Sequence, residues 1–309
     1  MLGIYIFGIA LLIDIITGEA PNRFHPVAWL GKLAAFIIKF NPRNGKVRQF
    51  IFGALTVILT ASAIALLIYF VLQATRNVNN ILYVLVSGYL LKNTFSLKGL
   101  WLAVNGVKKE LAGNNISAAK LKAQALVSRD VNSLDRQQLI SASIESCAEN
   151  LCDSFIAPLL YYAIFGLPGA ICYRIINTFD AMIGYHGQWE YTGKFAARLD
   201  DVLNFIPARL SGLFILLASA LCKANTGGGW HTMLAQHSFT ESPNAGWTMC
   251  AMAGALNITL EKKGNYTLGS TDTELSLAAI SQSQTIFLTA AAIWALIVMG
   301  KEVFFYAAT

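Results

Sequence analysis

Charged residues are what this sequence most clearly lacks. Only 13% of its 309 residues are Asp, Glu, Lys or Arg, whereas an ordinary soluble domain carries roughly 25%. Hydrophobic residues make up 55%, and the mean hydropathy is +0.53. A water-soluble fold of this size needs more charge to cover its surface, so the composition disfavours a purely soluble enzyme, a disordered chain and a secreted disulfide scaffold. It is typical of a polytopic membrane protein.

Cysteine pairs and familiar cofactor motifs are also lacking. The five cysteines are an odd number and contain no C-x-x-C pair, which argues against a disulfide framework, an iron–sulfur cluster and a zinc site. The four histidines form no H-E-x-x-H pair, and neither G-x-x-x-x-G-K-[ST] nor G-x-G-x-x-G is present. A glycine run at 227–229 could form an anion-binding nest, but such a run is more often only a flexible loop.

Long charge-free runs predict the membrane segments, because a spanning helix needs about 20 mainly apolar residues. We expect an all-α polytopic integral membrane protein with about four to six membrane helices, some of them short or re-entrant. Glycine and proline at 166–169 predict either a re-entrant pair of short helices or a single kinked span. The segments are expected at about 1–16, 51–73, 81–102, 154–180, 203–222 and 280–300.

The whole chain, 1–309, is expected to form one membrane-embedded domain. Lys and Arg are concentrated in loops 17–50 and 92–152, which places both loops in the cytoplasm and the N-terminus outside. The net charge of +6 fits this bias and does not call for a nucleic-acid partner. The first segment has no basic region before it, so we expect it to be retained as a helix. The helical loops expected to carry the site are 17–50, 103–153, 181–209 and 223–276.

Three acids occur at a spacing of four residues beside apolar sequence: Glu145, Glu149 and Asp153. On a helix this spacing puts them in one stripe, where like charges repel unless a cation joins them. Oxygen ligands of this kind indicate Mg²⁺, with nucleotide phosphates completing its shell. The alternative is a solvated acidic face paired with basic side chains of the preceding loop.

A second group of polar residues follows an apolar run. Arg174, Asn177 and Asp180 are three residues apart and share a helical face. Polar residues at membrane depth are expensive and point to function, although a buried structural ion pair of Arg174 is the alternative. Further along, Arg198 and Arg209 offer planar, bidentate donors for carboxylate or phosphate. The pair Asp200–Asp201 is only weakly similar to the Asp-rich motifs of membrane prenyltransferases.

Taken in order, these motifs resemble one family, adenosylcobinamide-phosphate synthase, the CobD/CbiB family of cobalamin biosynthesis. The resemblance covers about residues 5–270, and its central block, 145–210, is specific. The motifs are H-P-V-x-W-L-G (25–31), S-R-D (128–130), E-S-x-A-E-N-x-x-D (145–153), I-A-P-L (156–159), Y-R-x-x-N-T-x-D-A-M-x-G-Y (173–185), A-R-L-D-D-x-x-N-x-I-P-A-R-L (197–210) and S-P-N-A-G-W (242–247).

The resemblance implies an ATP-dependent ligase of the plasma membrane. Such an enzyme joins the propionate carboxylate of adenosylcobyric acid, a corrinoid, to the amine of (R)-1-amino-2-propanol O-phosphate through an acyl phosphate. ATP and Mg²⁺ would be the cofactors, membrane lipid would surround the chain, and other late cobalamin-pathway membrane proteins are candidate partners.

Within that frame, each motif residue receives an expected role. Glu145, Glu149 and Asp153 would hold Mg²⁺, while Asp200 or Asp201 would act as a further metal ligand or as the base. Arg174 and Arg198 would bind phosphate. The residues expected to line the substrate and phosphate pockets are His25, Arg129, Asp130, Asn150, Asn177, Asp180, Arg209, Ser242 and Asn244.

Two other classes remain open from the sequence. A Mg²⁺-dependent membrane transferase would also use acids clustered beside apolar helices, but it should show a diagnostic Asp repeat that this chain lacks. A non-enzymatic membrane sensor, similar to the AmpE-like proteins, would have a purely structural polar core and would turn over no ATP.

Overall fold

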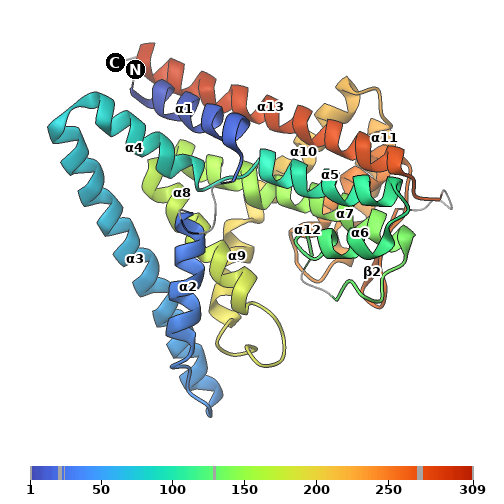
Figure 1. The fold of residues 1–309 in the computed structure, drawn as a ribbon, viewed down its shortest axis with the longest axis horizontal. Coiled ribbons are helices and arrows are strands. Elements are labelled where there is room, and N and C mark those ends of the chain that lie inside the picture. Colours follow the sequence, from blue (N-terminus) through green and yellow to red (C-terminus); the bar gives the residue numbers. More distant parts are fainter. Residues whose placement is uncertain (1, 20–22, 24, 128–129, 270–273, 308–309) are drawn as a thin grey trace. The chain divides into compact units, whose positions relative to one another are not determined.

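The computed structural model describes residues 2–19, 23, 25–127, 130–269 and 274–307, and nearly all of its regular structure is helical (Figure 1). Its contacts divide the chain into two compact units, 1–96 with 157–204 and 297–309, and 97–156 with 205–296. The elements are α1 Leu2–Thr17, α2 Pro26–Ile38, α3 Lys46–Val78, α4 Asn80–Lys92, α5 Lys98–Ala112, α6 Ile116–Ala123, α7 Arg136–Leu151, the π-helix η1 Cys152–Ile156, α8 Ala157–Ile183, α9 Lys194–Leu203, α10 Phe205–Leu221, α11 Thr226–Gln236, the 3₁₀ turn η2 His237–Phe239, α12 Ala245–Leu256, β1 Leu260–Lys262, β2 Tyr266–Leu268 and α13 Leu277–Ala307.

In the first unit, α1 packs along α4, and α8 packs against α2, α3, α4 and α9. The hairpin of α3 and α4 turns at Asn79, whose side chain accepts the backbone N–H of Leu82 at 2.7 Å and so caps α4. The loop before α9 lies directly on α3, because a Cβ at Gly53 would come within 1.9 Å of the Thr192 carbonyl oxygen. Only glycine permits that approach.

In the second unit, α12 packs against α7, α10 and α11, and the short hairpin of β1 and β2 lies against α7 and α12. The glycine run at 227–229 is part of α11, which corrects the expectation of an anion nest or a flexible loop. A Cβ at Gly254 of α12 would lie 2.3 Å from the Gly228 carbonyl oxygen. These glycines therefore serve close packing between the two helices.

The expected class, an all-α polytopic membrane protein, is confirmed. Among the described residues, three helical stretches are long and apolar enough to cross a membrane: α3, the continuous run from α7 through η1 to α8, and α13. The bent pair of α9 and α10 would make a fourth, and α1, α2, α4 and α12 are shorter apolar helices.

The expected segment 81–102 is not one helix. It divides because α4 ends at Lys92 and α5 begins at Lys98. The amide of Asn93 donates to the Tyr89 carbonyl oxygen and the hydroxyl of Thr94 donates to that of Leu91, each at 2.7 Å. Side chains thus satisfy the last carbonyls of α4 and stabilise its end there.

The break expected at 166–169 is present inside α8. Gly166 has φ 67° and ψ −163°, a conformation outside the helical region, and Pro168 follows it. Proline has no N–H to donate and its ring crowds the preceding turn, so the two halves of α8 meet at a fixed kink. Whether this kink makes a re-entrant pair or a bent span stays a prediction.

We predict that Gly166→Ala destabilises the protein by about 1–3 kcal/mol, because that backbone region is essentially restricted to glycine. Gly300→Ala is the matched control, since Gly300 lies in α13 with open space around its Cβ position. Thermal unfolding in one detergent compares the two variants. Equal midpoints for both would show that the kink does not depend on glycine.

Candidate functional site

The motif residues fall in both compact units, and each unit is described by itself. The first unit holds His25, Arg174, Asn177, Asp180, Arg198, Asp200 and Asp201. The second holds Asp130, Glu145, Glu149, Asn150, Asp153, Arg209, Ser242 and Asn244. Arg129 lies outside the described residues.

In the first unit, a chain of hydrogen bonds joins α8 to α9 and centres on the buried carboxylate of Asp200. The amide of Asn177 donates to Asp200 Oδ1 at 3.3 Å, and the amide of Asn204 donates to Oδ2 at 2.9 Å. Asn204 in turn accepts from the hydroxyl of Tyr173 at 2.9 Å. Both oxygens of Asp200 therefore have protein donors, as a buried carboxylate requires.

Arg174 extends this network, and one of its N–H donors has no hydrogen-bond acceptor among the described residues. Its Nη1 donates to Asn177 Oδ1 at 3.3 Å, while its Nε is buried and has no hydrogen-bond partner among the described residues. A buried donor without an acceptor costs about 1–3 kcal/mol. The guanidinium is held in place and presents an N–H group that an anionic ligand would satisfy.

The other motif acids and the second motif arginine of α8 and α9 are more exposed than Asp200. Asp201 and Asp180 are half-buried, whereas Arg198 is exposed and makes no ion pair or hydrogen bond with the described part of the chain. A Cβ at Gly184 would come within 2.0 Å of Asp180 Oδ1, so this carboxylate lies directly against the backbone after α8.

His25 has both ring nitrogens engaged inside the protein. Its Nδ1 accepts the backbone N–H of Val27 at 3.2 Å and caps α2, with Pro26 in the first helical turn. Its Nε2 lies 2.5 Å from Glu19 Oε2. The tautomer with the proton on Nε2 satisfies both contacts, so His25 is a helix cap in this structure, and its expected place in the substrate pocket stays a prediction.

Glu19 connects this cap to a buried charge pair that the motifs did not indicate. Lys92 Nζ lies 3.5 Å from Glu19 Oε1 and 3.5 Å from Asp14 Oδ1, and the Lys92 and Asp14 side chains are only 3% and 1% exposed. Burial raises the pKa of Glu19, but hydrogen bonds from His25 and Ser96 and the charge of Lys92 outweigh it and lower that pKa to about 2. The sequence did contain a sign of this pair, because each of the short apolar helices α1 and α4 carries a single charged residue.

In the second unit, the acidic stripe divides into one structural acid and two that are half-exposed. Glu145 is buried and accepts from the hydroxyls of Ser141 at 2.6 Å and Tyr266 at 2.8 Å. Ser141 Oγ also accepts the backbone N–H of Glu261 at 2.9 Å. These bonds fix the hairpin of β1 and β2 onto α7, and the sequence pattern gave no sign of Tyr266.

The three-carboxylate metal site expected from the spacing is not formed. Across the described residues, no group of three or more His, Cys, Asp or Glu side chains is placed to hold a metal ion. Glu145 is already committed to hydroxyl donors. In addition, Asp153 lies in η1, whose wider turns break the α-helical period on which the stripe depends. Such π turns often occur at functional sites.

Arg209 forms an aromatic stack with the S-P-N-A-G-W motif. Its guanidinium carbon lies 3.5 Å from the ring centre of Phe205 and 4.7 Å from that of Trp247, and its Nη1 reaches Asn244 Oδ1 at 3.5 Å. The Trp247 ring stacks on His237 with centroids 4.1 Å apart. Residues far apart in the sequence thus form one stacked cluster, with the Ser242 hydroxyl accepting the N–H of Asn244 beside it.

Two further motif residues have local roles. Asp130 is exposed and accepts from the backbone and side chain of Asn132, which forms a turn. The amide of Asn150 donates to the Ser146 carbonyl oxygen and accepts from the Ser154 hydroxyl, so it bridges α7 and η1.

The fold and these polar groups define a helical membrane protein that keeps a few connected charges inside apolar sequence. The family model described as CobD/Cbib protein matches residues 7–295. A protein of Dehalococcoides mccartyi named "Cobalamin biosynthesis protein CobD" is 44% identical over 96% of this chain and 96% of its own length. Two proteins named "Probable cobalamin biosynthesis protein CobD" follow: one from Methanocaldococcus jannaschii, 39% identical over 93% of this chain and 97% of its own length, and one from Methanococcus maripaludis, 40% identical over 89% and 93%.

The chain therefore belongs to the CobD/Cbib family. No solved structure matches it.

We predict that Glu145→Gln and Glu149→Gln differ in stability. Glu145 accepts two hydroxyl donors in the core, so its amide variant should lose about 1–3 kcal/mol. Glu149 is half-exposed, and its variant should stay within about ±0.5 kcal/mol of the wild type. Denaturant unfolding of the two purified variants checks this, and equal losses would contradict the division of the stripe.

Proposed function

We propose that this chain is an adenosylcobinamide-phosphate synthase. It would form an amide bond between a propionate carboxylate of adenosylcobyric acid and the amine of (R)-1-amino-2-propanol O-phosphate, with ATP converted to ADP and phosphate. Its membership of the CobD/Cbib family over almost its whole length supports this assignment, as do curated relatives named for cobalamin biosynthesis.

The chemistry requires that the carboxylate be activated first. A carboxylate is a poor electrophile, so its oxygen attacks the γ-phosphorus of ATP, ADP leaves, and an acyl phosphate results. The amine nitrogen then attacks the acyl carbon, phosphate leaves, and the nitrogen loses a proton to a base. Both steps place negative charge on phosphate oxygens, where positioned N–H donors lower the barrier.

The observation that carries the proposal is the unsatisfied Nε–H of Arg174. Asn177 holds this guanidinium from one side, and Asp200 holds Asn177. Every substrate of the proposed reaction is anionic at or near its reacting end, so a phosphate oxygen is the acceptor that fits. Arg198, exposed and without a partner in the described structure, would supply a second planar donor.

The acids of α9 divide into a positioning residue and a base. Both oxygens of Asp200 accept amide donors, which suits it to orient Asn177 and Arg174. Asp201, half-buried on the same helix, is the better base for the amine. Arg209 and Ser242, with Asn244 behind them, would contact a substrate beside the stacked cluster of the second unit.

Magnesium fits Glu149 and Asp153 better than the full stripe. Both side chains are half-exposed, and Mg²⁺ is commonly held by one or two carboxylates together with substrate phosphates. The bound ion would neutralise charge on those phosphates. ATP and soluble corrinoids are cytoplasmic, and the basic loops 17–50 and 92–152 favour the same side for the motif loops.

We expect purified protein to release ADP over many turnovers only when ATP, adenosylcobyric acid and the aminopropanol phosphate are all present. A coupled ADP assay with single omissions measures this, and mass spectrometry of the corrinoid detects the amide product. Repeated turnover of ATP without the amine, or a corrinoid left unchanged while ADP accumulates, would contradict the assignment.

Two variants link this turnover to the site. Arg174→Lys should lower turnover by about 10²-fold or more, because an ammonium cannot replace the planar fork. Glu149→Gln should abolish turnover with little loss of folding. Arg48→Lys, at an exposed position in the first turn of α3, is the control and should retain wild-type turnover. Full activity of Arg174→Lys would remove Arg174 from the phosphate site.

A further inference from the structure

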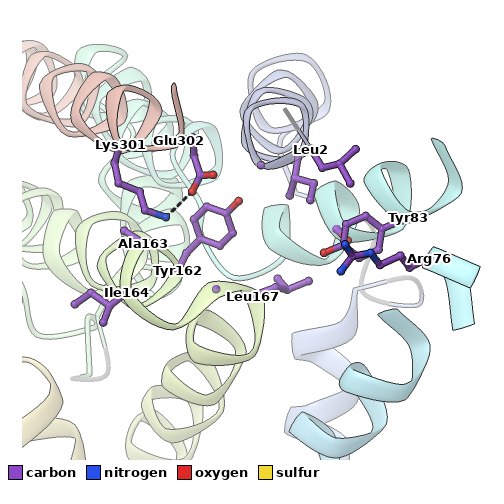
Figure 2. Close-up of a pocket in the computed structure, with 13 residues that line it drawn as sticks. Leu2, Arg76, Tyr83, Tyr162, Ala163, Ile164, Leu167, Lys301 and Glu302 are labelled. Atoms are coloured by element: carbon purple, nitrogen blue, oxygen red, sulfur yellow. Dashed lines mark hydrogen bonds and ion pairs between the residues drawn. The ribbon is translucent and has the colours of Figure 1, made fainter. Parts of the chain in front are cut away.

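A cavity in the first unit lies apart from every motif residue. Its volume is about 360 Å³, and its walls come from the start of α1, the end of α3, α4, the kink of α8 and the end of α13. Figure 2 shows Arg76 and Tyr83 on one side, with Lys301, Glu302 and Tyr162 on the other. A cavity of this size can hold a small ligand or a ligand's polar head.

The polar groups of this cavity favour an anion. The guanidinium carbon of Arg76 lies 5.9 Å from the ring centre of Tyr83, and none of its N–H groups donates to a described residue. Lys301 Nζ lies 2.8 Å from Glu302 Oε1. The lining therefore contains two basic side chains and one acidic side chain, which gives it a net positive charge. A phosphate can accept from a guanidinium in a bidentate arrangement.

Ser87 gives an independent sign of a ligand. Its side chain lines the same cavity and is 1% exposed, and its hydroxyl has no hydrogen-bond partner in the described structure. Buried hydroxyls are normally paired, because an unpaired one loses its bonds to water without replacement. An oxygen of a bound group in the cavity would supply the partner.

The position of the cavity identifies the source of that group. Arg76 lies in the last turn of α3, and Lys301 lies near the end of α13; both helices are long and apolar enough to span a membrane. An exposed tyrosine continues α13 past Lys301, with the Tyr306 side chain 45% exposed. Basic and aromatic side chains at the ends of spans mark the headgroup region of a bilayer.

We propose that this cavity binds the phosphate of a phospholipid headgroup. Arg76 and the Ser87 hydroxyl donate to phosphate oxygens, and Lys301 adds positive charge from the opposite wall of the cavity. Glu302 accepts from the hydroxyl or amine of the headgroup. The acyl chains lie against exposed apolar side chains next to the cavity, such as Ile164 and Phe165, which are 60% and 64% exposed.

Thermal unfolding of the delipidated full chain in detergent tests this with three probes. These are a phosphatidylglycerol, a diacylglycerol with the same acyl chains, and inorganic phosphate. We expect only the phospholipid to raise the unfolding midpoint in a saturable manner. Equal stabilisation by the diacylglycerol would show apolar binding alone, and equal stabilisation by inorganic phosphate would show a free-anion site; either result overturns the lipid assignment.

Variants of the cavity residues test whether the phospholipid binds at the cavity. Arg76→Gln and Ser87→Ala should each weaken the apparent lipid affinity by about tenfold, while Arg48→Gln, at the other end of α3, should bind as the wild type. Ser87→Ala keeps the fold intact, because it removes a hydroxyl that bonds to no described side chain. Wild-type lipid affinity in both cavity variants, with unchanged midpoints in the absence of lipid, would overturn the proposal.

Discussion

The proposed site depends on the hydrogen bonds that the buried carboxylate of Asp200 accepts. A buried carboxylate needs donors at both oxygens, and here these come from Asn177 on α8 and from Asn204 just after α9. Meeting that need ties the two motif helices together. It also fixes the amide of Asn177 so that its oxygen faces Arg174. The result is a guanidinium that is hydrogen-bonded on one side and still has a buried donor to offer.

The low charge of the chain makes such networks informative. In a protein with 17 acids and 23 basic residues among 309, each buried charge carries a cost and must be offset by a partner. Lys92 between Asp14 and Glu19 shows one solution, in which charges join α1, α4 and the cap of α2. Glu145 with Ser141 and Tyr266 shows another, in which an acid anchors a hairpin.

Much of this was predictable from the sequence, and the failures have physical causes. Charge-free runs gave α3 and α13, and the glycine and proline at 166–169 gave the break in α8. The spacing of three residues between Arg174 and Asn177 predicted that they share one face of that helix, and their hydrogen bond confirms it. The stripe of Glu145, Glu149 and Asp153 failed because spacing assumes a regular α-helix, and the π turns of η1 end that regularity.

Contacts between residues far apart in the sequence could not be predicted from sequence patterns. Tyr266 lies 121 residues from Glu145, and Arg209 lies close to the rings of both Phe205 and the distant Trp247. The two compact units are each built from separate stretches of the chain, and the hydropathy of the sequence does not predict this division. Periodicity reports which face a residue occupies, whereas these contacts depend on which helices become neighbours.

The central claim is that Asn177 holds Arg174 ready for a phosphate. Equilibrium binding of a non-hydrolysable ATP analogue and of the aminopropanol phosphate to an Asn177→Ala variant tests it most directly. Thr178→Val is the control, because the one hydrogen bond that the Thr178 hydroxyl makes to a described residue is to the Arg174 carbonyl oxygen. The account predicts that affinity for at least one of these phosphates falls by about tenfold in Asn177→Ala. This variant should stay folded but lose about 1–3 kcal/mol of stability, because one oxygen of Asp200 loses its donor, and the control should bind as the wild type. Wild-type affinity for both phosphates in Asn177→Ala would contradict it.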